Sequence, residues 1–230
     1  MALLAGCGEG GPGHDDLSDA SLSDAPPCAF DDAARRPDGR VVGGPFATSV
    51  ALFQPGPGAS FGHDQMPDIV LGPPHGAGDL RGGTDVVSLG QGGVIVLGFD
   101  PPLVDGPGPD FTVFENPFLV PGADLRYWHE LGEVSVSDDG VTWVTFPCDP
   151  AGPHPHTHCA GWEPVYAAPP YALCPLDPRV SGGEPFDLAA VGVSRARFVR
   201  VRDLATQGPT APAAGFDLDA IAALHQSPGP

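Results

Sequence analysis

The most regular alternation of apolar and polar positions lies in the stretch EVSVSDDGVTWVTF, residues 133–146. Valines at 134 and 136 alternate with polar residues, which is the two-residue period of a half-buried strand. Asp138-Asp139-Gly140 follows as a turn, because Asp tolerates the left-handed conformation and Gly adopts positive φ without a Cβ clash. Trp143 then opens an apolar return strand. The pattern predicts a β-hairpin.

Other apolar runs, separated by Gly and Pro, predict the remaining strands. Residues 86–90 and 93–99 are expected to pair through the turn Gln91-Gly92. The second run is apolar on both faces, which is typical of a central strand. Shorter strand-like runs cover residues 41–53, 111–114, 186–188, 191–193, 197–202 and 215–221. No long amphipathic helix and no repeat interrupts them, so we predict an all-β fold: a jelly-roll β-sandwich of about eight antiparallel strands with long Gly/Pro-rich loops.

Composition divides the chain into four parts. Residues 8–35 are rich in Gly, Pro, Ser and Asp and predict a disordered acidic linker, because they offer too little apolar surface to bury. Residues 36–226 are expected to form a single sandwich domain, with a tail at 227–230 and a truncated lipoprotein signal at 1–7. The 33 glycines and 30 prolines fall largely between apolar strands, which favours a loop-rich β fold over a disordered polymer.

The net charge of −19 rests on 29 acidic residues against ten arginines and no lysine. Nucleic acids and anionic lipid headgroups are recognised through basic surfaces, so neither is an expected partner. Divalent cations are favoured by such a surface. Solubility of an exported protein is the simpler explanation for most of these carboxylates.

The segment Leu4-Ala5-Gly6-Cys7 resembles the lipobox of bacterial lipoproteins, in which the cysteine becomes lipidated. It predicts an exported protein anchored through Cys7 at the outer membrane or cell surface, with no other attachment to a membrane. Only six residues precede Cys7, and they lack a basic region and a full apolar stretch.

Four further cysteines, Cys28, Cys148, Cys159 and Cys174, form an even set in an apparently exported chain. They predict two disulfides, for which three pairings exist. We favour Cys148–Cys159, since closing a loop of that size contributes about 3 kcal/mol in the chain-entropy model, and this leaves Cys28–Cys174. A thiolate metal site is the alternative, but the chain has no C-x-x-C pair.

The Ser-Asp-Asp-Gly-x-Thr-Trp hairpin and the strand ARFVRVRD at 196–203 resemble two motifs of discoidin-like (factor V/VIII type C) domains. These domains belong to the galactose-binding-like group of jelly-roll sandwiches, and the similarity extends over residues 68–224. The strings VSLG-GG, GPGPDF-VFEN and GFDLDA also resemble an uncharacterised group of secreted bacterial surface proteins. The resemblance implies a sandwich with ligand-binding loops and, in many such modules, a structural calcium ion held partly by the last strand.

Carboxylates near strand ends supply candidates for that ion. Calcium takes six to eight hard oxygens from constrained loops. Asp217 and Asp219 are expected on one face of the final strand, two residues apart. The other candidates lie in the loop before residue 111 and after residue 114: Asp105, Asp110, Glu115 and Asn116. The alternative is that these residues cap turns and accept hydrogen bonds from backbone amides.

Aromatic and planar polar side chains in predicted loops are candidates for a sugar-binding surface, because sugars stack on flat apolar rings. These candidates are Arg126, Trp128, His129, Trp162 and Tyr166. The predicted function is a non-catalytic cell-surface binding module whose ligand is a carbohydrate. A structural or protein-interaction module of a surface complex, with a surface protein as partner, is the alternative.

A second alternative is a metal-dependent hydrolase. His154, His156 and His158 alternate, so an extended segment would place the three imidazoles on one side, as in many catalytic zinc sites. A solvated, variable loop is the simpler interpretation, since no carboxylate lies at a known catalytic spacing and no nucleophile motif is present.

Overall fold

The computed structural model describes residues 28, 30, 43–120, 126–207 and 212–228. Within this part the chain is all-β with antiparallel pairing, as predicted, and its helices are three short 3-10 turns at His63–Gln65, Asp68–Val70 and Leu188–Val191. The predicted signal at 1–7, including Cys7, lies outside the described residues, as does the predicted linker apart from Cys28 and Phe30. None of the described helices is long and apolar enough to cross a membrane.

The larger sheet has six strands, and β9 is joined to it only through β7. Its path runs in the order β1 (Ser49–Gln54), β3 (Val94–Val104), β11 (Arg195–Asp203), β7 (Gly132–Ser137) and β8 (Val144–Thr145), with β9 (Cys159–Ala160) beside β7. β3 lies between β1 and β11, which confirms the central strand expected from its two apolar faces.

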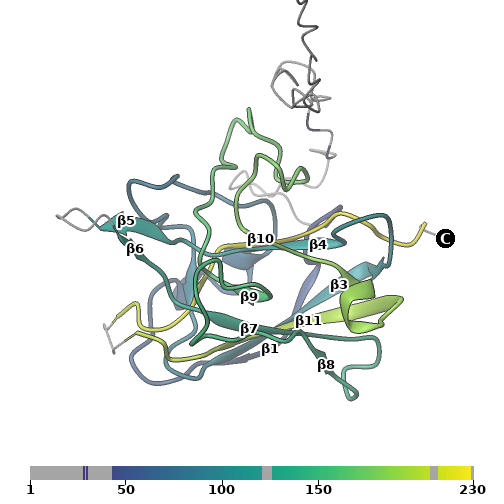
Figure 1. Cartoon of the computed structure of the whole chain (residues 1–230), viewed down its shortest axis with the longest axis horizontal. Helices are drawn as coiled ribbons and strands as arrows, with labels where there is room; N and C mark the ends of the chain where they lie inside the picture. Colours follow the sequence, from purple (N-terminus) through teal and green to yellow (C-terminus); the bar gives the residue numbers. More distant parts are fainter. Residues whose placement is uncertain (1–27, 29, 31–42, 121–125, 208–211, 229–230) are drawn as a thin grey trace, which may run out of the picture.

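A second layer faces this sheet, visible above it in Figure 1 as β10 and β4. It is the three-stranded sheet β10 (Glu184–Phe186), β4 (Phe111–Phe114) and β13 (Ala220–Ala223). Two short pairs complete the described strands: β2 (Val87–Ser88) with β12 (Asp217–Leu218), and β5 (Phe118–Val120) with β6 (Arg126–Trp128). The described strands outnumber the predicted ones because many are only two or three residues long.

Both faces of the smaller sheet are buried. Phe111 and Val113 of β4 pack into the main core against the larger sheet, whereas Phe114 points to the opposite face. On that face Phe114 packs with Phe46 and Val165, so the long segment between β9 and β10 acts as a cover. The sequence of this segment has few strand signals. Its conformation is stabilised by packing of residues such as Val165 against the smaller sheet.

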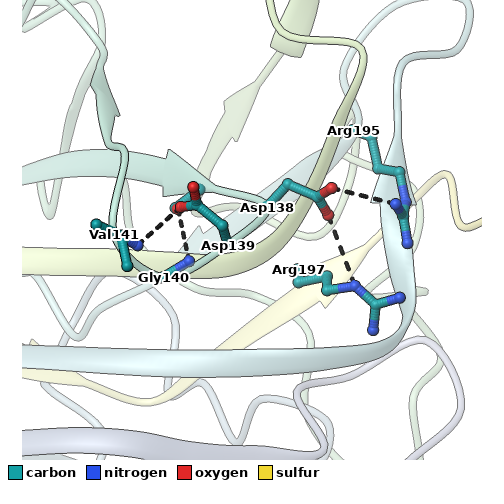
Figure 2. Close-up of polar contacts among 7 residues, drawn as sticks. Asp138, Asp139, Gly140, Val141, Arg195 and Arg197 are labelled. Carbon is teal, nitrogen blue, oxygen red and sulfur yellow. Dashed lines mark hydrogen bonds and ion pairs between the residues drawn. The ribbon is translucent and has the colours of Figure 1, made fainter.

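The predicted hairpin is confirmed as β7 and β8, with Val136 opposite Val144. Gly140 has φ 73°, and its amide donates to Ser137 Oγ at 2.9 Å. The carboxylate of Asp139 accepts from the amides of the next residues in the turn, and these bonds lower its pKa to about 2. Figure 2 shows the turn, with Asp138 held by Arg195 at 3.1 Å and Arg197 at 3.7 Å.

The hairpin expected from residues 86–90 and 93–99 is wrong. β2 pairs with β12, while β3 pairs with β1 and β11. The turn itself exists, because Gly90 and Gly92 both have positive φ and Gly93 N donates to Gly90 O at 2.9 Å. After this turn the two runs do not pair with each other. The amide of Leu89 instead donates a hydrogen bond to the carbonyl of Phe216 at 2.9 Å.

Both favoured disulfides are present. Cys148–Cys159 closes a short loop beside β9, and Cys28–Cys174 joins residues 146 apart in the sequence. Phe30 packs edge-on against Phe46 at 5.4 Å between ring centroids. Cys28 and Phe30, two residues of the predicted linker, therefore contact the sandwich.

Candidate functional site

Three carboxylates from separate parts of the fold meet in the interior. Glu115 directly follows β4, Glu130 lies between β6 and β7, and Asp217 begins β12. One ligand oxygen from each lies within 4.8 Å of the others, and all three residues are buried. We refer to Glu115, Glu130 and Asp217 as the carboxylate cluster.

Hydrogen bonds from backbone amides and strand geometry orient these side chains. Glu115 continues the alternation of Phe111 and Val113, which turns it toward the space between the layers. Glu130 Oε1 accepts from the amide of Gly215 at 3.0 Å, and the Trp128 side chain also donates to this carboxylate.

Asp217 is held by two neutral donors. It accepts from the hydroxyl of Ser88, its partner across the β2–β12 pair, and from the side chain of Asn116. Asn116 is itself fixed by a 3.0 Å bond from Nδ2 to the carbonyl of Gly83. These bonds orient Asp217 without neutralising its charge.

Glu115 has one carboxylate oxygen, Oε2, that lacks a hydrogen-bond partner. Its Oε1 accepts a 3.3 Å bond from the amide of Asp217, whereas its Oε2 is buried and has no hydrogen-bond partner. A buried carboxylate oxygen without a partner is costly, and natural structures rarely leave one unexplained. None of the ion pairs in the described part of the chain involves a member of the cluster.

The pKa values of the cluster reflect this crowding. Burial, followed by the charges of Asp217 and Glu130, raises the pKa of Glu115 well above its usual range. Burial and then the charge of Asp217 raise the pKa of Glu130 to about 8, and burial raises that of Asp217 to about 7. Two unit charges about 5 Å apart repel by roughly 3 kcal/mol at an effective dielectric constant near 20. At neutral pH the cluster therefore needs either bound protons or a cation.

Two neighbouring buried carboxylates already have their partners. Asp203 accepts from the amides of Gly92 and Ala205, each at 2.8 Å, and of Phe216 at 2.9 Å. Glu184 likewise accepts three backbone amides, from residues 161–163, at 2.6 to 2.8 Å. Such carboxylates hold loops in place and have little capacity left for a ligand.

The six predicted metal ligands do not form one site. Glu115, Asn116 and Asp217 come together, whereas Asp105 and Asp110 form a second group with Asp187. Asp110 is fully buried and occupied: it accepts from the amides of Gly106 and Leu188, and its Oδ1 lies 2.9 Å from His225 Nδ1. For Asp110 the alternative interpretation, an Asp that holds turns, fits the structure.

Asp219 does not join Asp217, because the expected final strand is two strands. β12 pairs with β2 and β13 pairs with β4, and Asp219 lies at the break between them. Its carboxylate accepts from the amide of His75, at 2.9 and 3.1 Å. The two-residue spacing in the sequence therefore does not place both side chains in one site.

Sequence reasoning missed Glu130. It belongs to the segment Tyr127-Trp128-His129-Glu130-Leu131, directly before β7, the first strand of the predicted hairpin. An acidic residue between an aromatic run and a buried Leu131 was the available signal. Its use as a member of the cluster depends on Gly215, 85 residues away, and could not follow from local pattern.

The predicted sugar-binding residues are only partly surface platforms. The side chain of Trp128 donates a hydrogen bond to Glu130, and Trp162 donates through Nε1 to the carbonyl of Cys159 at 3.1 Å. Tyr166 is 41% exposed, and burial with the nearby charge of Asp79 raises its pKa. His129 is half-buried, and Arg126 lies in β6 with its side chain outside the described residues.

The histidine loop is not an extended strand with three rings on one side. His158 has φ 62°, and its ring stacks on Phe146 at 6.3 Å. The rings of His154 and His156 instead lie 6.1 Å apart, and His129 lies 5.4 Å from His156. The three-histidine set of the predicted loop is therefore replaced by one that includes His129.

Comparison of the chain with models of protein families finds no match, and comparison with curated proteins finds none either.

Proposed function

We propose that this protein is a non-catalytic binding module whose β-sandwich is stabilised by a structural calcium ion in the carboxylate cluster. The observation that carries this proposal is the buried Oε2 of Glu115, which has no partner although two further carboxylates lie beside it. A divalent cation supplies the missing partner and offsets the repulsion among the three charges. Burial of all three residues favours a structural ion over a catalytic one.

Calcium fits the donors better than other cations. The cluster offers carboxylate oxygens, with the hydroxyl of Ser88 and the amide of Asn116 beside Asp217, and contains no thiolate or imidazole. Calcium accepts six to eight such oxygens in flexible geometry, whereas magnesium demands a near-ideal octahedron and retains water. Zinc and copper prefer nitrogen and sulfur ligands.

Calorimetric titration of calcium into cation-free protein tests the ion. We expect one calcium per chain, with binding lost in Glu115→Gln. Glu184→Gln is the matched control, because Glu184 is equally buried but its oxygens are occupied by backbone amides. This control is expected to be less stable yet to bind calcium with the same stoichiometry. Wild-type protein that binds no calcium, or Glu115→Gln that binds like wild type, contradicts the proposal.

Export and surface anchoring belong to the same proposal. Two disulfides support an oxidising compartment, because cytosolic thiols are kept reduced. Lipidation at Cys7 would anchor the sandwich, and the hairpin and the all-β fold support membership of the galactose-binding-like group.

For the ligand we propose a carbohydrate, bound at the exposed ring of Tyr166. The charges of Asp79 and Glu163 contribute to the raised pKa of Tyr166, so both carboxylates lie near this flat ring. Carboxylates can accept hydrogen bonds from sugar hydroxyls while the ring stacks on the sugar. The backbone of Glu163 is fixed, because its amide donates to Glu184 Oε1 at 2.6 Å.

A glycan array with wild-type protein and Tyr166→Ala tests the ligand. We expect binding of a sugar that falls at least about fivefold in the variant, since loss of one stacking ring removes roughly 1 kcal/mol or more. Val141→Ala is the control, because Val141 is exposed on the hairpin turn. A surface protein captured by a Tyr166-dependent contact, with no sugar bound, would favour the protein-interaction module.

A further inference from the structure

A second group of potential ligands lies outside the carboxylate cluster and has no part in the proposed function. His129 precedes β7, while His154 and His156 come from the loop closed by the Cys148–Cys159 disulfide. The ring centroids of His129 and His156 are 5.4 Å apart, and those of His154 and His156 are 6.1 Å apart. We refer to these three residues as the histidine cluster.

Two of the rings are prepared for a ligand. The ring of His129 donates to the backbone carbonyl of Tyr127, which fixes its orientation and leaves its other nitrogen to accept. Nδ1 of His156 is buried and has no hydrogen-bond partner. Metal-binding histidines characteristically use one nitrogen for a backbone carbonyl or carboxylate and the other for the metal.

The surroundings hold the loop against the sandwich. The ring of His154 meets Trp162 edge-on at 5.1 Å, and Trp162 is fixed by its bond to the carbonyl of Cys159. Glu163 lies close enough to His154 to interact with it electrostatically. A carboxylate therefore lies near His154, on the exposed side of the histidine cluster.

We propose that His129, His154 and His156 bind a transition-metal ion of the zinc class, with Glu163 or water as the remaining ligand. Three imidazoles and an oxygen form a common tetrahedral zinc set. Rings bound to one zinc ion have centroids roughly 5 Å apart, because each ring centre lies roughly 3 Å from the metal. The separations of the two pairs that include His156, 5.4 and 6.1 Å, are somewhat larger than this value.

Binding requires the rings to turn. The ligand atoms of the three histidines do not all lie within 4.8 Å of one another, as those of the carboxylate cluster do. His154 is exposed, so rotation of its side chain costs little packing. The bound ion would tie the disulfide-closed loop to the segment that precedes β7.

Zinc titration of the full chain, with disulfides intact and Cys7 alkylated, tests this site. Saturating calcium is present throughout to occupy the carboxylate cluster. We expect one zinc per chain, with affinity about 100-fold or more weaker in His156→Ala, since even indirect supports of a ligand contribute 10–100-fold. His154→Ala is a second variant that leaves the interior intact, and it is expected to weaken binding as well. His158→Ala, in the same loop but stacked on Phe146, is the control and should bind as wild type.

Each result separates this site from the calcium site. Zinc binding lost in His156→Ala and His154→Ala but retained in Glu115→Gln supports the histidine cluster, whether or not calcium binds. No zinc binding by the wild type overturns the proposal, as does binding that is unaffected in both histidine variants. Binding lost in Glu115→Gln alone also overturns it, because zinc would then occupy the carboxylates.

Discussion

Calcium-free protein is expected to lose stability as the pH rises from 5.5 to 8, whereas calcium-loaded protein should gain or keep it. The folded-state pKa of Asp217 is raised to about 7 and that of Glu130 to about 8, so the calcium-free native state binds protons that the unfolded chain releases. Stability from these groups is full below their unfolded pKa values near 4 and is lost as the pH rises through the folded ones. Calcium reverses the trend because it binds the deprotonated carboxylates.

The difference should be largest at pH 8. Calcium at about 100 times its dissociation constant adds about 2.7 kcal/mol to the free energy of unfolding. For a domain of this size that corresponds to roughly 5–10 °C in Tm. Scanning calorimetry at pH 5.5 and 8, with protein passed over a chelating resin and then returned to buffer with or without calcium, measures both effects.

Glu115→Gln provides a sharp control for this prediction. Removal of one of three crowded charges should make the calcium-free variant more stable than calcium-free wild type at pH 8, although it abolishes the increase produced by calcium. Identical pH profiles for wild-type protein with and without calcium would show that no ion occupies the cluster.

Asp203→Ala is expected to be the most destabilising change near the site, at about 3–5 kcal/mol. The side chain is 1% exposed and accepts three backbone amides, which tie the end of β11 to the Gln91-Gly92 turn and to Phe216 before β12. Hydrogen bonds to a charged group contribute about 1.5–3 kcal/mol each. The amides of the exposed residues Gly92 and Ala205 can turn to water, so the loss falls below the full sum.

Urea unfolding of Asp203→Ala and Asp139→Ala, both with calcium, measures this effect against a matched control. Asp139 also accepts two backbone amides, but it lies in the exposed hairpin turn. We therefore expect a clearly smaller loss for Asp139→Ala. Equal losses in the two variants would mean that burial of the Asp203 bonds contributes nothing.

Several features follow from local pattern alone. The alternation of Val134 and Val136, with Asp and Gly in the turn, predicts the β7–β8 hairpin because a side-chain period of two and a left-handed glycine are local properties. The apolar run at 93–99 predicts a central strand, and β3 has a neighbour on each side. The cysteine count and loop length indicate both disulfides.

Strand partners could not be predicted in this way. The sequence predicts that residues 86–90 pair with residues 93–99, because only the Gln91-Gly92 turn separates them. β2 instead pairs with β12, near the other end of the chain. The final strand divides between two sheets at Asp219. A short apolar run has no local preference for one partner over another, so its pairing depends on which edges are free when the layers close.

The order of residues along the chain is enough to predict the class of the fold, its hairpin, its disulfides and an acidic character suited to cations. Which carboxylates meet depends on the folded chain, in which Glu115 and Asp217 lie beside Glu130. Asp110 instead accepts hydrogen bonds from backbone amides, and Asp219 accepts one from the amide of His75. Burial and electrostatic repulsion both act through space. They depend on the approach of one residue after β4, one before β7 and one in β12, and no spacing along the chain encodes that distance.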